Sequence, residues 1–211
     1  MMERLNLAIV YGSAGKSRFC DTIVNWLVPI ILEDGDFLIE TIDPAQIKHA
    51  PQGGRHNCPT SSQIRPAIAE ADAYLIVTPE YNHSFTGELK LLIDSAREEW
   101  RRKPAGFVTY GGISGGLRAA EQLRSVFGEL HVATIRETVS FANVWECFDD
   151  HGRPYDLANA KLAAQKQLAD LKWWARALRE ARLPMRTLEQ STMTETRATP
   201  GLTSTLHNQF A

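Results

Sequence analysis

Residues 11–19, Tyr-Gly-Ser-Ala-Gly-Lys-Ser-Arg-Phe, have the composition of an anion-binding loop. Small residues let backbone N–H groups approach an oxyanion, and the helix predicted to follow adds a favourable dipole at its first turn. The hydroxyls of Ser13 and Ser17 and the planar guanidinium of Arg18 are donors suited to phosphate oxygens. The stretch therefore predicts a phosphate site, with either Lys16 or Arg18 as its cation.

The same stretch contains Gly15-Lys16-Ser17, which resembles the end of a nucleotide-binding P-loop. That motif requires another glycine five positions before Gly15. Position 10 is Val10, inside a predicted strand, so the loop is too short for the motif. The Gly-x-Gly-x-x-Gly dinucleotide fingerprint is also absent, which argues against both nucleotide-binding classes.

A second stretch, residues 79–87, reads Pro-Glu-Tyr-Asn-His-Ser-Phe-Thr-Gly and follows the buried apolar run 73–78. Open α/β sheets bind ligands at the carboxyl ends of their strands, where a rigid proline and a planar tyrosine are suited to hold a flat ring. Pro79 ends the strand, and Asn82 can adopt an unusual backbone angle. His83 invites a role as a proton donor, but a histidine beside a turn is more often structural.

A third stretch, residues 111–116, places four glycines in six residues and precedes a predicted helix. Such a loop lets the backbone approach a flat ligand closely. In a parallel sheet this loop and the two described above lie at one edge, so all three are predicted to line one crevice. Arg118, just beyond it, is interpreted as a solvated helix residue or a subunit contact.

These three loops resemble those of the NADPH-dependent FMN reductase family, which is flavodoxin-like and includes quinone, azo-dye and chromate reductases. The resemblance runs from about Leu5 to Arg182 and is most specific in residues 79–87 and 115–124. It implies an α/β three-layer sandwich with a five-stranded parallel sheet in the order 2-1-3-4-5. Two residues depart from the family pattern: Ala14 replaces an arginine, and Thr86 stands where relatives often carry proline.

The resemblance implies that FMN binds with its phosphate at the first loop and its ring between the other two. NADPH or NADH would reduce the flavin, and a quinone, azo compound, metal oxyanion or free flavin would then take the electrons in a ping-pong cycle. No side chain is assigned as catalytic, and no metal is expected. The candidate FMN-binding residues are Ser13, Ser17, Arg18, Phe19, Pro79, Glu80, Tyr81, Asn82, Gly111, Gly112, Ser114, Gly115 and Gly116.

Apolar runs that alternate with helical patterns predict βαβ units, and right-handed crossovers would place helices on both faces of the sheet. Strands are predicted at residues 5–11, 36–42, 73–78, 105–110 and about 130–135, the last with an irregular continuation to 141. Helices are predicted after residue 19 and at 60–71, 87–100, 116–127 and 156–181.

The composition is that of an ordinary globular protein, with 211 residues, 44% hydrophobic and 23% charged. A net charge of -2 provides no basic field for nucleic acid, and no run has the length of a membrane span. Three widely spaced cysteines fit neither a disulfide framework nor a zinc site, so a cytoplasmic location is expected.

Residues 1–183 are predicted to form the reductase domain, and residues 184–211 either a flexible tail or an arm that wraps a neighbouring subunit. The resemblance implies a homodimer or homotetramer, and the candidates for its interface are Trp100, Trp145, Trp173 and Trp174, although each such residue is more often core or partly buried. Two other functions stay open: a flavodoxin-like electron-transfer module without a nicotinamide site, and a sensor or structural protein that has lost the cofactor.

Overall fold

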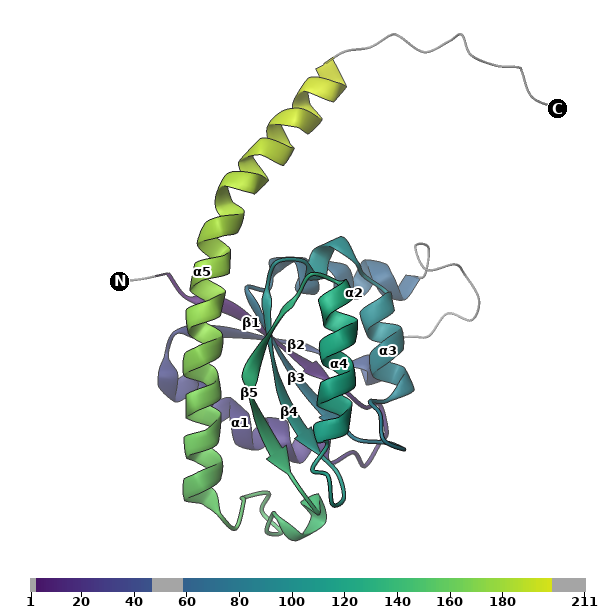
Figure 1. Cartoon of the computed structure of the whole chain (residues 1–211), viewed down its shortest axis with the longest axis vertical. Helices are drawn as coiled ribbons and strands as arrows, with labels where there is room; N and C mark the ends of the chain where they lie inside the picture. The colour runs from purple at the N-terminus through teal and green to yellow at the C-terminus, as the bar shows by residue number, and fades with distance from the viewer. Residues whose placement is uncertain (1–2, 47–58, 199–211) are drawn as a thin grey trace, which may run out of the picture. The chain divides into compact units, whose positions relative to one another are not determined.

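The computed structural model describes residues 3–46 and 59–198, and its centre is a parallel sheet (Figure 1). The strands pair in the order β2-β1-β3-β4-β5, all of them in parallel, which confirms the predicted flavodoxin-like topology. Their bounds are β1 Leu5–Tyr11, β2 Phe37–Ile42, β3 Ala73–Pro79, β4 Pro104–Tyr110 and β5 Ala133–Phe141.

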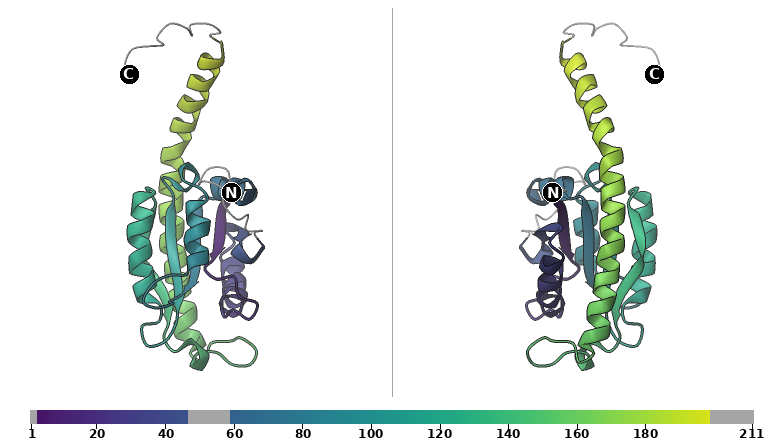
Figure 2. Two further views of the ribbon diagram at one scale, coloured as in Figure 1. Left: turned by 90° about the vertical axis from the view of Figure 1, so that its right-hand side faces the viewer. Right: turned by 90° about the vertical axis from the view of Figure 1, so that its left-hand side faces the viewer.

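Helices cover both faces of the sheet, as Figure 1 and the two views of Figure 2 show. One buried apolar cluster joins the sheet to α1 and to residues 157–179 of α5, and a second joins the other face to α2, α3 and α4. The helices are α1 Cys20–Asp34, α2 Pro59–Glu70, α3 Gly87–Asp94, α4 Leu117–Glu129 and α5 Leu157–Ala198, with 3-10 turns η1 Pro44–Gln46, η2 Glu98–Trp100 and η3 Val144–Glu146.

The prediction of one helix over residues 87–100 was wrong, because α3 ends at Asp94. Ser95 closes the helix: its backbone N–H and its hydroxyl both donate to the carbonyl of Leu92, the latter at 2.5 Å. The separate turn η2 then buries Trp100, whose indole N–H donates to the Ile93 carbonyl at 3.1 Å. Trp100 therefore packs under α3 instead of continuing it.

The last strand begins later than predicted. The chain turns at His131, which has a left-handed backbone (φ +56°), and pairing with β4 starts at Ala133. The register between the two strands shifts between Ala105 and Phe107, after which the strands stay paired as far as Phe141. The strand thus reaches the carboxyl edge of the sheet, which matters for the site below.

The last helix runs beyond its predicted end at Ala181 and continues to Ala198. The contacts within the chain divide it into a unit that ends at Arg179 and a second unit that begins at Glu180. Residues 184–198 are therefore helical, whereas residues 199–211 lie outside the described part. Their role as a tail or a subunit arm stays a prediction.

Within residues 3–46 and 59–198, the longer helices carry too many polar residues to cross a membrane. Most of the loop predicted between β2 and α2 falls on residues 47–58, which are not described.

Candidate functional site

The loops that follow β1, β3 and β4 meet at the carboxyl edge of the sheet, at the bottom of Figure 1. We name them loop one (residues 12–19), loop two (residues 80–86) and loop three (residues 111–116). The backbone N–H of Gly12 donates to the Val77 carbonyl at 2.7 Å, and that of Glu80 donates to the Tyr110 carbonyl at 2.9 Å. The structure thus brings the three predicted loops together.

Loop one presses closely against β3. A Cβ added at Gly12 would lie 2.4 Å from Cβ of Thr78, so only glycine fits there. The Thr86 hydroxyl donates to the Gly12 carbonyl and accepts from the Leu89 N–H at 3.1 Å, which caps α3. Proline, which the resemblance gives at this position in many relatives, has no hydroxyl for this bridge between loops one and two.

Loop one carries a set of donors without acceptors. Among the described residues, nothing accepts a hydrogen bond from the backbone N–H groups of residues 13–17. The hydroxyl of Ser13 is buried close to the hydroxyl of Tyr110, but the geometry between them does not meet the criteria for a hydrogen bond. Lys16 and Ser17 are exposed at the tip. Orphaned donors beside a helix start fit an oxyanion such as a phosphate.

Arg18, a predicted phosphate ligand, bonds to groups of the chain itself. Its Nη1 donates to the Ser13 carbonyl at 2.7 Å and to Asp43 at 2.5 Å; its Nη2 donates to Asp43 at 2.6 Å and Asp21 at 2.9 Å. Its Nε donates to Asp21 at 3.1 Å, and its guanidinium lies 4.5 Å from the centre of the Tyr11 ring. All five N–H groups of the guanidinium are therefore committed inside the protein.

The pair of Arg18 and Asp43 is buried, with side chains 9% and 8% exposed. Burial by itself raises the pKa of the Asp43 carboxyl, but hydrogen bonds from Arg18 and the Ala45 N–H outweigh it and hold that pKa below its usual value. Hydrogen bonds to Asp43 and Asp21 in turn raise the pKa of Arg18. Asp43 follows β2, so this pair ties loop one to the end of that strand.

Loop two is a tight turn. The backbones of Asn82 and His83 are left-handed (φ +52° and +68°), and Tyr81 and Ser84 exchange backbone hydrogen bonds of 2.8 and 3.1 Å. Positive φ at both central positions is what type I′ turns require, and asparagine tolerates it well. The Gln122 amide donates to the His83 carbonyl at 2.6 Å. The main chain of His83 thus supports the turn, while its side chain is exposed.

Glu80 joins loop two to loop three. Its carboxylate accepts from the Arg118 guanidinium at 2.9 Å and from the Arg118 backbone N–H, in the first turn of α4, at 3.1 Å. Burial raises the pKa of Glu80, but hydrogen bonds from Ser114 and Arg118 outweigh it, so that pKa is lowered. Arg118, which was interpreted as solvated, is 45% exposed and pairs with a carboxylate that is 6% exposed.

Loop three is pressed onto β4 by its last two glycines. Gly115 and Gly116 have left-handed backbones (φ +61° and +84°), and a Cβ added at Gly116 would lie 2.6 Å from Cβ of Thr109. The Gly115 carbonyl accepts from Thr109 at 2.9 Å and from Ser140 at 2.8 Å. Among the described residues, the N–H groups of residues 112–114 find no acceptor. They are free to meet an electron-rich ligand edge.

The remaining candidates lie as follows. Pro79 is the buried last residue of β3, and the Gly111 N–H donates to the Phe141 carbonyl at 3.2 Å. The Phe19 ring packs against Tyr110 and Phe148, with centroids 6.1 and 5.3 Å away, so it contributes to the core beneath loop one.

Residues 141–151 were expected to contribute to the open face of the ring although they contain no motif, and in this stretch the structure places the turn η3 after β5. Its backbone bonds to loop three, and Trp145 in it is 64% exposed. With Tyr81 (55%) and Ile113 (87%), the edge carries three exposed apolar side chains near loops with free N–H groups. A lone tryptophan in a stretch without a motif is the only sequence signal for η3.

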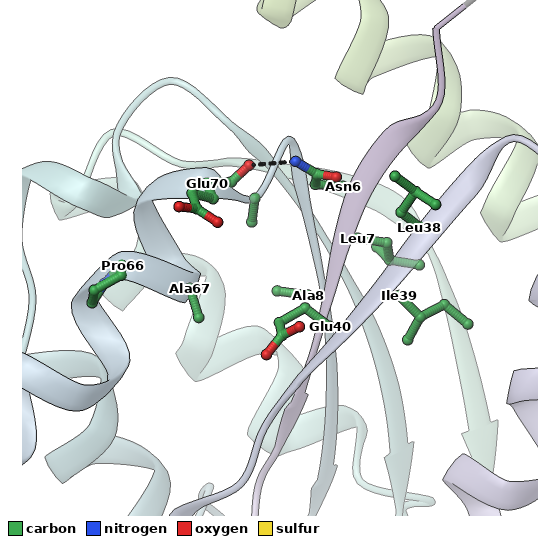
Figure 3. A pocket seen from close by; sticks show the side chains of 10 residues that line it. Asn6, Leu7, Ala8, Leu38, Ile39, Glu40, Pro66, Ala67 and Glu70 are labelled. Carbon is green, nitrogen blue, oxygen red and sulfur yellow. Dashed lines mark hydrogen bonds between the residues drawn. The ribbon is translucent and has the colours of Figure 1, made fainter.

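Two cavities are lined by residues outside the three loops. One of about 380 Å³ lies between β1, β2 and α2, with the carboxylates of Glu40 and Glu70 in its wall (Figure 3). The other, of about 560 Å³, lies between α1, residues 150–153 and the start of α5. Neither combines free backbone donors with a glycine-rich loop.

Comparison with known proteins agrees with this geometry. A family model described as NADPH-dependent FMN reductase matches residues 5–146. An NAD(P)H-dependent FMN reductase of Saccharomyces cerevisiae is 37% identical over 152 residues, which cover 62% of this chain and 78% of the relative. An NAD(P)H-dependent FMN reductase of Schizosaccharomyces pombe is 31% identical over 133 residues, 59% of this chain and 66% of the relative.

A 2-hydroxy-1,4-benzoquinone reductase of a Burkholderia species is 30% identical over 140 residues, which cover 63% of this chain and 75% of the relative. Among solved structures, the flavoenzyme NAD(P)H:(acceptor) oxidoreductase FerB of Paracoccus denitrificans has a TM-score of 0.69 at 21% identity. That similarity covers 82% of this chain and 98% of the other, and it shows the shared fold alone.

Proposed function

The chain belongs to the NADPH-dependent FMN reductase family, and from this premise we propose that it is an FMN-dependent NAD(P)H oxidoreductase that reduces a small organic acceptor by a ping-pong cycle. The observation that carries the proposal is the pairing of two surfaces at one edge of the sheet. Loop one offers donors to an anion, and loops two and three offer free N–H groups beside exposed apolar side chains.

The residues at this edge fit FMN. The N–H groups of residues 13–17, the orphaned hydroxyl of Ser13 and the exposed Lys16 would hold the phosphate. The main chain of loops two and three would hold the ring. When bound, FMN supplies the redox chemistry, and the protein supplies its position and electrostatic surroundings.

The chain's own groups would act by orientation and charge. The free N–H groups of residues 112–114 would stabilise negative charge on an electron-rich ring edge, as an oxyanion hole does. Glu80 and Arg118 neutralise one another and hold loop two against the end of loop three. Burial raises the pKa of the Cys20 thiol to about 12 and also raises that of Tyr110, so neither buried group serves as an acid or base near neutral pH.

The test is an absorption spectrum of the purified protein incubated with FMN, followed by anaerobic addition of NADPH or NADH. Flavin bands that bleach with either donor would support the proposal. Bands that persist with both donors would replace it with an electron-transfer module, and a protein that takes up no FMN would exclude a flavoenzyme. Adding a quinone, an azo compound, chromate or free FMN to the reduced protein then ranks the acceptors by the rate at which the bands return.

We also propose a homodimer or homotetramer in the cytoplasm. The proposal rests on the family resemblance and on the exposed indoles of Trp173 (62%) and Trp174 (37%) on α5. Light scattering at micromolar concentration tests the oligomeric state, because a mass of one 23.6 kDa chain would contradict the proposed oligomer.

A further inference from the structure

The turn η3 is fixed to loop three by the backbone. The Asn143 N–H donates to the Gly112 carbonyl at 2.9 Å, and the Val144 N–H donates to the Gly111 carbonyl at 3.1 Å. Asn143 has a left-handed backbone (φ +48°), which turns the chain sharply after β5. The side chain of Val144 is 4% exposed and anchors the turn in the core. The side chains of η3 are therefore held in a fixed position beside loop three.

The turn presents a bare indole. A Cβ added at Gly112 would lie 3.8 Å from Cη2 of Trp145, so the indole lies beside the backbone of loop three. Yet 64% of this side chain is exposed, although burying a large apolar side chain is normally favourable. The indole of Trp26, by contrast, packs edge-on against the Phe141 ring at 5.5 Å. Among the described residues, Trp145 has no aromatic ring stacked on it.

We propose that Trp145 is the stacking residue for the electron acceptor, and that it selects neutral planar aromatic acceptors of the quinone class. This inference rests on the proposed function, because it assigns the acceptor of that reaction. Covering an exposed aromatic face with a second flat ring is favourable, and a rigid turn holds the first ring in place for this contact. Ile113, also in loop three, is 87% exposed and adds an apolar neighbour.

The charge on the residue after Trp145 favours a neutral acceptor over an oxyanion. Glu146, the next residue, is exposed, and within the described residues no ion pair neutralises it. Its carboxylate would repel chromate or another metal oxyanion, whereas an uncharged quinone would not be affected. The arrangement therefore discriminates by shape and by charge together.

The experiment measures equilibrium binding of 1,4-naphthoquinone to the FMN-loaded, oxidised protein without any nicotinamide, by calorimetry. Trp145→Ala should raise the dissociation constant about tenfold, which corresponds to the upper part of the range for one aromatic pair. Trp145→Phe should restore most of the binding. Leu32→Ala removes an apolar side chain of comparable exposure (60%) from α1, a different part of the fold, and should leave binding unchanged.

Turnover provides the second readout. In Trp145→Ala the KM for 1,4-naphthoquinone should rise while kcat and the dissociation constant for FMN stay within about twofold, because stacking contributes to binding. The rate with ferricyanide, which is neither planar nor neutral, should not fall.

The outcomes separate this inference from the proposed function. If the flavin bleaches with NAD(P)H in wild type and in Trp145→Ala, and both bind the quinone equally, Trp145 is not the stacking residue although the reductase assignment stands. If Trp145→Ala weakens FMN binding as much as quinone binding, its role is structural and the inference is overturned. If wild type takes up no FMN, the proposed function itself fails.

Discussion

Loop one and the pair formed by loops two and three each have an arginine close by, and the two arginines are used differently. Arg18 is 9% exposed, and its guanidinium N–H groups donate to Asp43, Asp21 and the Ser13 carbonyl. Arg118 is 45% exposed and pairs with Glu80 across the gap between two loops. The comparison teaches that an arginine's role near a glycine-rich loop depends on which protein groups take its donors. In both regions the arginine holds loops together.

The largest expected effect comes from breaking the buried pair. Arg18→Ala leaves the Asp43 carboxylate buried without its partner, and removing one member of a buried ion pair typically costs about 3–5 kcal/mol. Urea unfolding of the protein without FMN measures this. The control is Lys90→Ala, which breaks an exposed pair with Asp94 and should cost less than about 1 kcal/mol. Equal losses in the two variants would contradict the role given to Arg18.

Backbone strain should distinguish the glycines of the two regions. Gly116→Ala forces a side chain into a left-handed backbone and against β4, which should destabilise the protein by about 1–3 kcal/mol or more. Gly15→Ala, at the open tip of loop one, meets nothing within 4 Å and should be neutral or slightly stabilising. Thermal unfolding of both variants checks this. A stable Gly116→Ala would show that loop three can leave β4.

The contacts of Glu80 with Arg118 should contribute less to stability than the buried pair of Arg18 and Asp43. Glu80→Ala removes a cap from α4 and the partner of Arg118, with an expected loss of about 1–2 kcal/mol. Glu80→Gln keeps an acceptor for the Arg118 N–H and should lose less. Glu121→Ala, at a side chain 73% exposed on the same helix, serves as the control. If Glu80→Ala unfolds at the same urea concentration as this control, Glu80 does not have the stabilising role given to it.

Lys16 should answer which cation meets the phosphate. Because Arg18 has no spare donor, Lys16→Ala should weaken FMN by about 1 kcal/mol and leave riboflavin, which lacks the phosphate, unaffected. Fluorescence titration with both flavins measures this difference. Equal weakening of FMN and riboflavin would assign Lys16 a structural role, and no change would leave the phosphate to backbone N–H groups.

Acid should weaken the region around loop one by a small, separable amount. The folded pKa of Asp43 lies below its unfolded value, so its contribution is present above about pH 4 and is lost as the pH falls through the folded pKa. Asp43→Asn should flatten this part of the curve of unfolding free energy against pH. Urea unfolding between about pH 3 and about pH 6 tests it. A variant with the same acid slope as wild type would remove Asp43 from the explanation.

Much of the fold follows from local pattern. The apolar runs that become β1, β3 and β4 are buried along nearly their whole length, which is why they were readable as strands of a parallel sheet. The errors fall where tertiary contacts overrule the pattern. Ser95 ends α3 although an apolar periodicity continues, because its N–H and hydroxyl donate to the Leu92 carbonyl while the Trp100 indole donates to that of Ile93.

The amino-acid sequence by itself determined the class of this protein, its sheet and the three loops, because glycine, proline and asparagine mark turns through their own backbone preferences. Only the tertiary structure decided what the charged and aromatic residues do. Arg18 meets Asp43 from 25 positions away, and Trp145 reaches loop three because η3 bonds to its backbone. A side chain's role depends on which partners take its donors and what covers its surface, and no local pattern records either.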